Sequence, residues 1–383
     1  MRSPYSIFTR RNTKGKKYFC IRFFDTSGKV IRTISLPKTI TSRLNAVREA
    51  ERLYAKGIVS QEQNPFVYEY LQAFWKPDSD YAEGKRLRGS PLSASYLKLN
   101  QLAIKRAKPF LEKKRILDIT PTVIERMILV LSRSGIHPRL INVTLQSVTV
   151  PLNYFFRTHG IPNPLKAVIT RVKENPKERG TLTIQELKAL ITIEDVAPQV
   201  YAGVLLGALC GLRIGECLGL TWEDVDEKQG ILNIRQAFNP LEGVKHPKWN
   251  SVRQVPAPEV VLQALRRCRE TAPWESPTFI LWNTRTPHRP VGRDTVQRGF
   301  MQMLHRIGID EAQRVERNLT FHGLRHTYVS LSRAAGVPDF IVQRIVGHKS
   351  VEMTEGYTHA TVVDFLSAKQ KMESALKVQE MMP

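Results

Sequence analysis

The sequence predicts a mainly helical α+β protein of several domains, with small β-sheets and a mixed helical domain at its C-terminal end. Three observations support this class. The chain has 383 residues, enough for two to three domains of roughly 150 residues each. Apolar side chains recur at helical spacing over most of the chain, and the alternation typical of strands is confined to short stretches. Two polar segments, 58–64 and 172–180, separate three parts of the chain.

Positive charge is concentrated in the first half of the chain. Lys and Arg number 58 and Asp and Glu number 35, which gives a formal net charge of +23. Residues 1–60 carry +11 and residues 61–177 carry +10, whereas residues 178–383 carry only +2. This excess requires a polyanionic partner, either nucleic acid or an anionic membrane surface. The nearly neutral C-terminal part is the expected place for chemistry.

A membrane partner is not expected. The longest uncharged stretches, 140–156 and 196–212, hold 17 residues each, and a spanning helix needs roughly 20 apolar residues. Residues 1–9 lack the apolar run of a signal peptide. The four cysteines form no C-x-x-C pair, which is typical of reduced, buried thiols. We therefore expect a cytoplasmic protein whose partner is nucleic acid.

Residues 1–60 are predicted to form a small basic sheet followed by a helix. Lys17–Phe24 and Val30–Leu36 show strand alternation on either side of a Ser-Gly turn, which predicts a hairpin. Gly57 closes a helix whose apolar positions are Leu44, Val47, Leu53 and Tyr54. A sheet of this kind can lie in a DNA major groove. The charge favours DNA binding over an ordinary small module.

Residues 65–172 are predicted to be a helical domain with basic residues between its apolar stripes. The stripes are Leu97, Ala103 or Ile104, Ala107 and Leu111; Val123, Met127 and Val130 or Leu131; and Val148, Leu152 and Phe155. The next segment, 172–180, is poor in apolar residues and contains Pro176 and Gly180. It is therefore expected to link two domains.

The third domain, residues 178–383, begins with a helix signal. Thr183 and Glu186 form a capping box, and Leu182 and Leu187 form a hydrophobic staple. Four short stretches follow that carry chemically useful residues. They are Gly211–Glu216 after an apolar helix at Val200–Leu209, Pro247–Pro256 after a strand at Ile231–Phe238, His322–His326, and Gly347-His348 with Tyr357.

These stretches combine two arginines, two histidines, a lysine and a tyrosine. The sequence has no Walker loop, no H-E-x-x-H and no acidic set for two metals, so we expect neither ATP nor a metal nor any other cofactor. Arginine pairs neutralise phosphate oxygens, histidine and lysine move protons, and tyrosine is an oxygen nucleophile. Together they predict metal-free attack of a phenol on a phosphodiester.

The order Arg, Lys, His-x-x-Arg, Gly-His and Tyr resembles the tyrosine recombinases, or phage-type integrases. The blocks Gly-Leu-Arg-x-x-Glu, His-x-Leu-Arg-His, Gly-His and Tyr-Thr-His occur in family order over about residues 180–360. The resemblance implies that Arg213 and Arg325 clamp the scissile phosphate and that His322 assists proton transfer and holds the phosphate. It implies that His348 hydrogen-bonds the phosphate or the developing charge and that Tyr357 is the nucleophile.

The lysine has two candidates in the same loop. In the family this lysine lies eight residues before the proline that closes the next strand, which selects Lys248 as the general acid because Pro256 is that proline. Lys245 remains the alternative. Among the neighbours, Glu216 is expected to orient Arg213, His326 to be a buried structural histidine, and Cys210 and Cys217 to belong to the core.

The resemblance also implies an arm-binding, heterobivalent integrase that cleaves and rejoins double-stranded DNA through a 3′-phosphotyrosyl intermediate. Residues 1–60 would bind arm-type sites, residues 65–172 would bind core-type sites, and residues 178–383 would be catalytic. The implied assembly is a homotetramer on paired sites, acting on a mobile element with DNA-bending and directionality factors as further partners. A type IB topoisomerase-like enzyme and a non-catalytic DNA-binding regulator are the alternatives.

A last amphipathic helix follows the proposed nucleophile. Its apolar positions are Val362, Phe365 or Leu366, Met372 and Leu376. The resemblance implies that each tail docks on a neighbouring protomer, and folding back on its own domain is the alternative. Docking on a neighbour predicts that truncation after Thr361 leaves single-site DNA binding near normal and impairs assembly and recombination.

Overall fold

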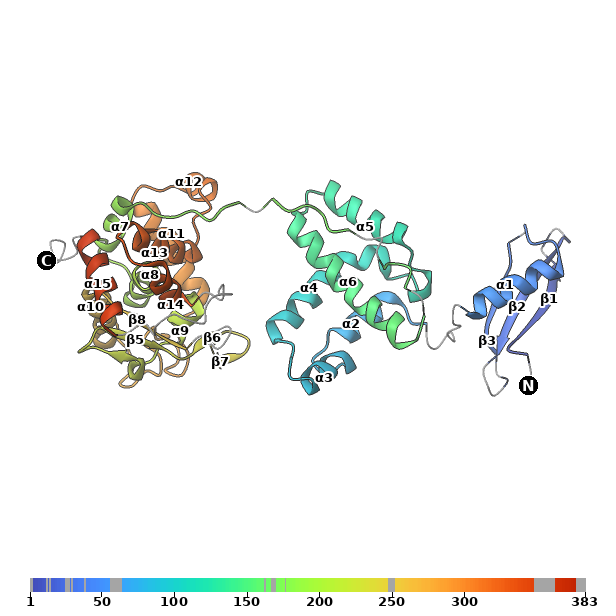
Figure 1. Cartoon of the computed structure of the whole chain (residues 1–383), viewed down its shortest axis with the longest axis horizontal. Coiled ribbons are helices and arrows are strands. Elements are labelled where there is room, and N and C mark those ends of the chain that lie inside the picture. Colours follow the sequence, from blue (N-terminus) through green and yellow to red (C-terminus); the bar gives the residue numbers. More distant parts are fainter. Residues whose placement is uncertain are drawn as a thin grey trace. The chain divides into compact units, whose positions relative to one another are not determined.

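A computed structural model of the chain describes residues 3–11, 13, 15–24, 28, 30–37, 39–55, 64–161, 163–166, 170–175, 177–246, 252–347 and 362–376. Figure 1 shows short sheets among many helices, in keeping with the predicted mainly helical α+β class. The chain divides into two compact units, residues 1–175 and 176–383. In the described parts, no helix is long and apolar enough to cross a membrane.

The chain begins with a three-stranded antiparallel sheet. Its strands are β1 (Tyr5–Arg11), β2 (Lys17–Phe24) and β3 (Val30–Ser35), in the order β1-β2-β3. The predicted hairpin is confirmed as β2 and β3. The prediction missed β1, because its second half, Thr-Arg-Arg, breaks the apolar alternation and resembles a basic tail. Strand β2 pairs with all seven residues of β1 on one side and with β3 on the other, so it is the central strand.

Helix α1 (Arg43–Ala55) packs on one face of this sheet, and the predicted stripe is confirmed only in part, because Leu53 packs against the core. Leu44 and Tyr54 are 62% and 50% exposed, and the buried positions of the helix are Ala46 and Ala50. Alanines let a helix backbone lie close to a sheet whose own Ile21 and Phe23 already fill the core. The predicted closing residue Gly57 lies outside the described residues.

The described residues that follow in the N-terminal unit form five α-helices and a short 3-10 helix at Ile116–Asp118: α2 (Val67–Phe74), α3 (Asp80–Leu87), α4 (Ala94–Leu111), α5 (Pro121–Arg133) and α6 (Pro138–Thr158). The predicted stripes on α4 and α6 are confirmed as buried. On α5 the open choice resolves to Leu131, because Val130 is 40% exposed, and Ile124 is a further buried position. These faces meet in one hydrophobic core.

The C-terminal unit is built around one buried helix. Helix α8 (Pro198–Leu209) is apolar on all sides and packs against α10 (Glu259–Glu270), α11 (Arg293–Arg306) and α13 (Phe321–Ala334). The other helices are α7 (Ile184–Ile191), α9 (Ile214–Gly219), α12 (Glu311–Glu316) and α14 (Asp339–Val346). Figure 1 shows α8 among the other helices of this unit. The predicted capping box at the start of α7 is confirmed.

The predicted single strand Ile231–Phe238 is wrong, because the structure divides it between two sheets. Strand β5 (Ile231–Ile234) lies between β4 (Val225–Asp226) and β8 (Arg253–Pro256), and β6 (Ala237–Asn239) pairs with β7 (Gly243–Lys245). The side chains of the two residues between β5 and β6, Arg235 and Gln236, bond residues that come earlier in the chain. Arg235 Nε donates to Asp224 at 2.6 Å and Gln236 Nε2 donates to the Gly219 carbonyl at 2.8 Å. This unit therefore contains two described sheets.

Helix α15 (Val362–Leu376) packs against its own domain, which is the alternative that the sequence interpretation placed second. Its buried residues are Phe365, Ala368, Met372 and Leu376, and they join the core of the C-terminal unit. Ser332 Oγ lies 3.4 Å from Met372 Sδ, and Lys371 Nζ donates to the Gly336 carbonyl at 3.0 Å. The apolar stripe of the tail therefore has a partner surface within the single chain.

All four cysteines are buried, as expected. Cys20 lies on β2, whereas Cys210, Cys217 and Cys268 lie in the C-terminal unit. Burial raises the pKa of the thiols of Cys210, Cys217 and Cys268. Within the described residues, no group of three or more His, Cys, Asp or Glu side chains could hold a metal ion.

Candidate active site and DNA-contacting surfaces

Three of the six predicted catalytic residues lie in the described part of the chain: Arg213, His322 and Arg325. Lys248, His348 and Tyr357 lie outside the described residues. Their places in the sequence are nevertheless bounded by described elements. Lys248 falls between β7 and β8, His348 directly follows the last described residue after α14, and Tyr357 falls between α14 and α15.

Arg213 is held at the start of α9 by a tight turn and by Glu216. Gly211 has a φ of +65°, and a Cβ there would lie 2.8 Å from the Tyr328 ring and 2.9 Å from Val346. Only glycine fits this turn, which ends α8 and presents Arg213 as the N-cap of α9. Glu216 accepts from the Arg213 backbone N–H at 2.9 Å and from Nη1 at 2.8 Å. The expected contact between Glu216 and Arg213 is present.

Arg325 reaches the same place from α13. Its side chain is buried, Nη1 donates to the Gly211 carbonyl at 2.8 Å, and Nη2 donates to the Val346 carbonyl. Burial and the nearby Arg213 lower the pKa of the Arg325 guanidinium. Arginine keeps its proton in proteins, so the shift records an unfavourable placement of positive charge. An anion bound beside both arginines would relieve that cost.

His322 lies one turn before Arg325 on the same helix, and its imidazole is half-buried. Burial, followed by the positive charges of Arg179, His326, Arg325 and Arg213, lowers the pKa of His322 to about 4. The ring is therefore neutral near pH 7 and can accept a proton. A bound phosphate would stabilise the protonated ring and raise this pKa.

His326 is half-buried, so it is less enclosed than the sequence suggested. Its ring lies edge to face with His322 at 5.4 Å between centroids. Burial and the charges of Arg179 and Arg325 lower its pKa. Arg179, in the predicted linker, contributes to the potential at both histidines and was not predicted. No spacing signal would have selected it among the basic residues of that segment.

Arg253 is a further member of this group that sequence reasoning missed. It begins β8, and its side chain is 7% exposed. Nη2 and Nη1 donate to the two carboxylate oxygens of Glu216 at 2.8 Å and 3.2 Å, and Nε donates to the Ile345 carbonyl at 2.6 Å. Its position in the Pro247–Pro256 stretch, just after the lysine loop, was the available signal.

Three arginines thus donate to three consecutive carbonyls where α14 ends. Arg253 binds Ile345, Arg325 binds Val346, and Arg213 Nη2 donates to Gly347 at 3.1 Å. The C-terminal end of a helix carries partial negative charge, which suits this arrangement. This group contains three guanidinium groups and one carboxylate, that of Glu216. It therefore carries a net positive charge at the end of α14, directly before His348 in the sequence.

Of the two lysine candidates, the structure places only Lys245. It ends β7, is 40% exposed, and its Nζ lies 2.6 Å from Glu242 Oε2. A surface pair of this kind is easily broken by a stronger anion. The choice between Lys245 and Lys248 therefore stays as the sequence left it.

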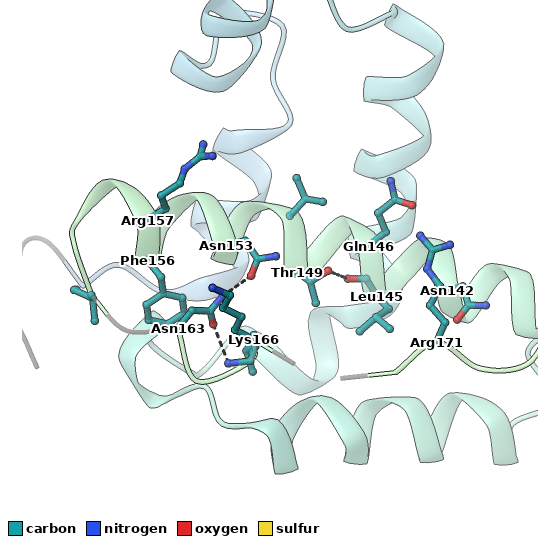
Figure 2. Close-up of a pocket in the computed structure, with 13 residues that line it drawn as sticks. Asn142, Leu145, Gln146, Thr149, Asn153, Phe156, Arg157, Asn163, Lys166 and Arg171 are labelled. Carbon is teal, nitrogen blue, oxygen red and sulfur yellow. Dashed lines mark hydrogen bonds between the residues drawn. The ribbon is translucent and has the colours of Figure 1, made fainter. Parts of the chain in front are cut away.

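A basic groove lies along α6 in the N-terminal unit. The cavity measures about 940 Å³ and lies between α6 and the segment that follows it. Figure 2 shows Arg157, Asn153, Gln146 and Asn142 on α6, with Asn163, Lys166 and Arg171 from the later segment. Its thirteen lining residues include three cations, four side-chain amides and no acidic residue. Such a lining suits a phosphate backbone or base edges.

The face of the N-terminal sheet opposite α1 is a second basic surface. Strand register places Ser6, Arg22 and Thr33 in one row and Phe8, Cys20 and Ser35 in the next. Arg22 and Arg10 both lie over the Phe8 ring, at 4.8 Å and 5.4 Å from its centroid. Stacking on an aromatic ring holds the two guanidinium groups over this face.

The model of the phage integrase family matches residues 181–363. The tyrosine recombinase XerA of Pyrococcus furiosus is 25% identical over 75% of this chain and 95% of its own length. The transposase from transposon Tn916 of Enterococcus faecalis is 27% identical over 51% of each chain.

Two solved structures share the fold. One is the Tn1549 transposon integrase in complex with transposon right end DNA, with a TM-score of 0.58 and 22% identity over 81% of this chain and 99% of that one. The other is a lambda integrase tetramer bound to a Holliday junction, with a TM-score of 0.58 and 19% identity over 91% and 98%. Residues 181–363 therefore form a phage integrase family domain, and the homologues of the chain are tyrosine recombinases and integrases, which are DNA strand-transferring enzymes.

Proposed function

We propose that the chain cuts and rejoins double-stranded DNA at specific sites of a mobile element, with Tyr357 as the nucleophile. One observation carries the assignment of the site. Arg213, from the start of α9, and Arg325, from α13, meet at the end of α14, directly before His348, and His322 lies one turn before Arg325 on α13. The relatives include a transposon transposase and structures of integrases on DNA, which supports a mobile element as the substrate.

The reaction needs no external energy. The phenolic oxygen of Tyr357 forms a bond to the scissile phosphorus while the bond from phosphorus to the 5′ oxygen breaks. Tyr357 loses its proton, for which neutral His322 is the acceptor, and Lys248 gives a proton to the departing 5′ oxygen. The 5′-hydroxyl of a partner strand then attacks the phosphotyrosine in the reverse sense. The phosphodiester bond energy is kept throughout, because each bond that breaks is replaced by one of the same kind.

The arginines supply the electrostatic part of catalysis. Charge builds up on the two non-bridging oxygens as the phosphorus becomes five-coordinate, and fixed guanidinium groups stabilise it without reorganising. In the free protein, Arg213 Nη2 and Arg325 Nη2 are bound to carbonyls of α14. Phosphate is the stronger acceptor because it is charged. The substrate would therefore draw both donors away from the end of the helix.

Covalent trapping tests this function. The substrate is a nicked duplex whose short 5′-hydroxyl strand diffuses away after cleavage, so the phosphotyrosyl adduct cannot reverse. A denaturing gel should show a protein–DNA band that survives boiling and disappears after proteolysis, with no metal or ATP added. Absence of the band on every duplex that the protein binds specifically would contradict the proposal and favour a DNA-binding regulator. Adduct formation without strand exchange between two duplexes would favour a topoisomerase.

Arg325→Lys should slow cleavage by about 10²- to 10³-fold, the usual effect of losing one donor to the transition state. Lysine keeps the charge but cannot bond the Gly211 carbonyl and a phosphate oxygen at the same time from one planar group. Single-turnover cleavage at saturating protein measures the effect, and core-site binding should change little. Arg306→Lys is the control, because Arg306 bonds the Glu194 and Asp195 carbonyls outside the site. Equal slowing of both variants would contradict the clamp.

We propose further that residues 1–60 bind arm-type DNA through the open face of the sheet. The segment carries +11. Arg22 and Arg10 lie over Phe8 on that face, and α1 covers the opposite one. Strands bearing arginine, serine and threonine can read base edges in a major groove. Residues 65–172, with the groove of Figure 2, would contact the core site.

Deletion of residues 1–60 should abolish binding to arm-type duplexes and leave core-type duplexes bound. The logarithm of the affinity falls with the logarithm of salt concentration by roughly 0.9 per phosphate contacted on duplex DNA. The slope for a DNA that carries both sites should therefore become shallower. Salt titrations measure this slope. Arg22→Gln should reduce it and Arg52→Gln should not, because Arg52 is paired with Glu49 on α1. An unchanged slope after deletion would refute the arm-type assignment.

Assembly on paired sites completes the proposal. A lambda integrase structure contains a tetramer on a Holliday junction. Four copies of this chain would provide the four cleavages that exchange of two duplexes requires. DNA-bending and directionality factors would act by bringing arm and core sites to one assembly, since a single chain would hold both kinds of DNA.

A further inference from the structure

Arg253 connects two parts of the active site that belong to separate elements. On one side its guanidinium forks onto Glu216, which holds Arg213. On the other side Nε bonds the Ile345 carbonyl, and a Cβ added to Gly347 would lie 3.3 Å from Arg253 Cδ. Arg253 therefore contacts both the support of one clamp arginine and the end of the helix that precedes His348.

Glu216 is shared between two arginines. Its carboxylate accepts four hydrogen bonds, two from Arg213 and two from Arg253, which fills its acceptor sites. Burial favours the neutral acid, but the hydrogen bonds and charges of Arg253 and Arg213 outweigh it and lower the pKa of Glu216. Because the negative charge is divided, Arg213 is only partly neutralised and keeps attraction for a phosphate.

Strand pairing fixes the position of Arg253. It is the first residue of β8, and its backbone is in register with Ile234 of the buried strand β5. Lys248, the proposed general acid, lies five residues earlier in the same stretch. The side chain of Arg253 bonds the Arg213–Glu216 pair and the end of α14, and its backbone continues from the stretch that holds Lys248.

We propose that Arg253 is a positioning residue for strand transfer, which holds Glu216 in a shared bond so that Arg213 stays available to the scissile phosphate, and which fixes the chain that leads into His348. This inference rests on the proposed roles of Arg213 and His348. Without Arg253, the whole charge of Glu216 would bear on Arg213 and hold it away from the phosphate.

The test compares single-turnover cleavage of the nicked duplex by the full chain and its variants. Arg253→Met should slow cleavage by about 100-fold, as expected when a clamp group is misplaced, and leave core-site binding unchanged. Adding Glu216→Gln to Arg253→Met should recover about tenfold of the rate, because the two residues are directly coupled. Arg253→Lys, which keeps the charge and loses the fork, should lie between wild type and Arg253→Met.

Arg317→Met is the matched control. Arg317 makes an equivalent fork to Glu186, with Nη–Oε distances of 2.6 Å and 2.8 Å, in the same unit but outside the proposed site. It should alter thermal stability without slowing cleavage. Three outcomes would overturn the inference: cleavage by Arg253→Met at the wild-type rate, equal slowing by Arg317→Met, or no recovery in the double variant. If Arg253→Met does not fold, the cleavage rates of Arg253→Lys alone and of Arg253→Lys combined with Glu216→Gln are compared instead, and the same outcomes apply. Failure of the wild-type chain to form an adduct would instead refute the proposed function.

Discussion

Tyr357→Phe should form no covalent adduct with DNA and should lower the cleavage rate by at least about four orders of magnitude, as loss of a nucleophile does in other enzymes. The substitution removes one hydroxyl and none of the basic surface, so binding to core-type and arm-type duplexes should remain. The measurement pairs covalent trapping on the nicked duplex with gel-shift titrations at fixed salt.

Tyr201→Phe is the control for this substitution. Tyr201 lies on α8, and its hydroxyl donates to the Ile191 carbonyl at 2.5 Å. Its loss should cost about 1 kcal/mol of stability and leave cleavage intact. An adduct that still formed with Tyr357→Phe, at any rate close to that of the control, would mean that another residue is the nucleophile.

Truncation after Thr361 should destabilise the C-terminal unit by roughly 5–9 kcal/mol, because it exposes the surfaces that bury Phe365, Met372 and Leu376 at about 1.5–3 kcal/mol each. That is a large share of the total for a domain, which is about 5–15 kcal/mol. This expectation replaces the one from sequence, in which single-site binding by the truncated chain would stay near normal. Thermal and urea unfolding of the full and truncated chains measure the difference.

Point substitutions on the same helix separate the buried face from the exposed one. Met372→Ala should cost about 2–5 kcal/mol, whereas Gln370→Ala, on the exposed side, should cost almost nothing. Equal stability of the truncated and full chains would show that α15 does not contribute to the fold of its own domain. That result would favour the other hypothesis, in which α15 docks on a neighbouring protomer.

The sequence identified side chains whose roles depend on local spacing. His322 and Arg325 are three residues apart, so any helix brings them to one face, and the blocks around Arg213 and Gly347 mark helix ends through glycine. Arg253 could not be selected in this way. Its role arises from partners 37 and 92 residues away, Glu216 and Ile345, which are brought together only by the folded chain.

The same distinction explains the errors in the fold. The break between β5 and β6 depends on bonds that Arg235 and Gln236 make to Asp224 and Gly219, which no alternation of apolar residues reveals. Only part of the buried face of α1 was predicted, because Ala46 and Ala50 give a weak apolar signal, although small residues suit close packing. On α15 the apolar periodicity correctly predicted an amphipathic helix. Periodicity does not indicate whether the surface that buries the apolar face belongs to the same chain or to a neighbouring protomer.

The buried cysteines make the chain a set of natural probes for local opening. Each thiol is 0% exposed, so a thiol-reactive dye in native buffer can label a cysteine only when its surroundings unfold. Cys20 would report opening of the N-terminal sheet, and Cys210, Cys217 and Cys268 would report opening of the C-terminal unit. Residues 64–175 contain no cysteine and stay silent. Labelling followed by mass spectrometry would therefore show which part of one chain is protected when arm-type or core-type DNA is added, with no engineered label.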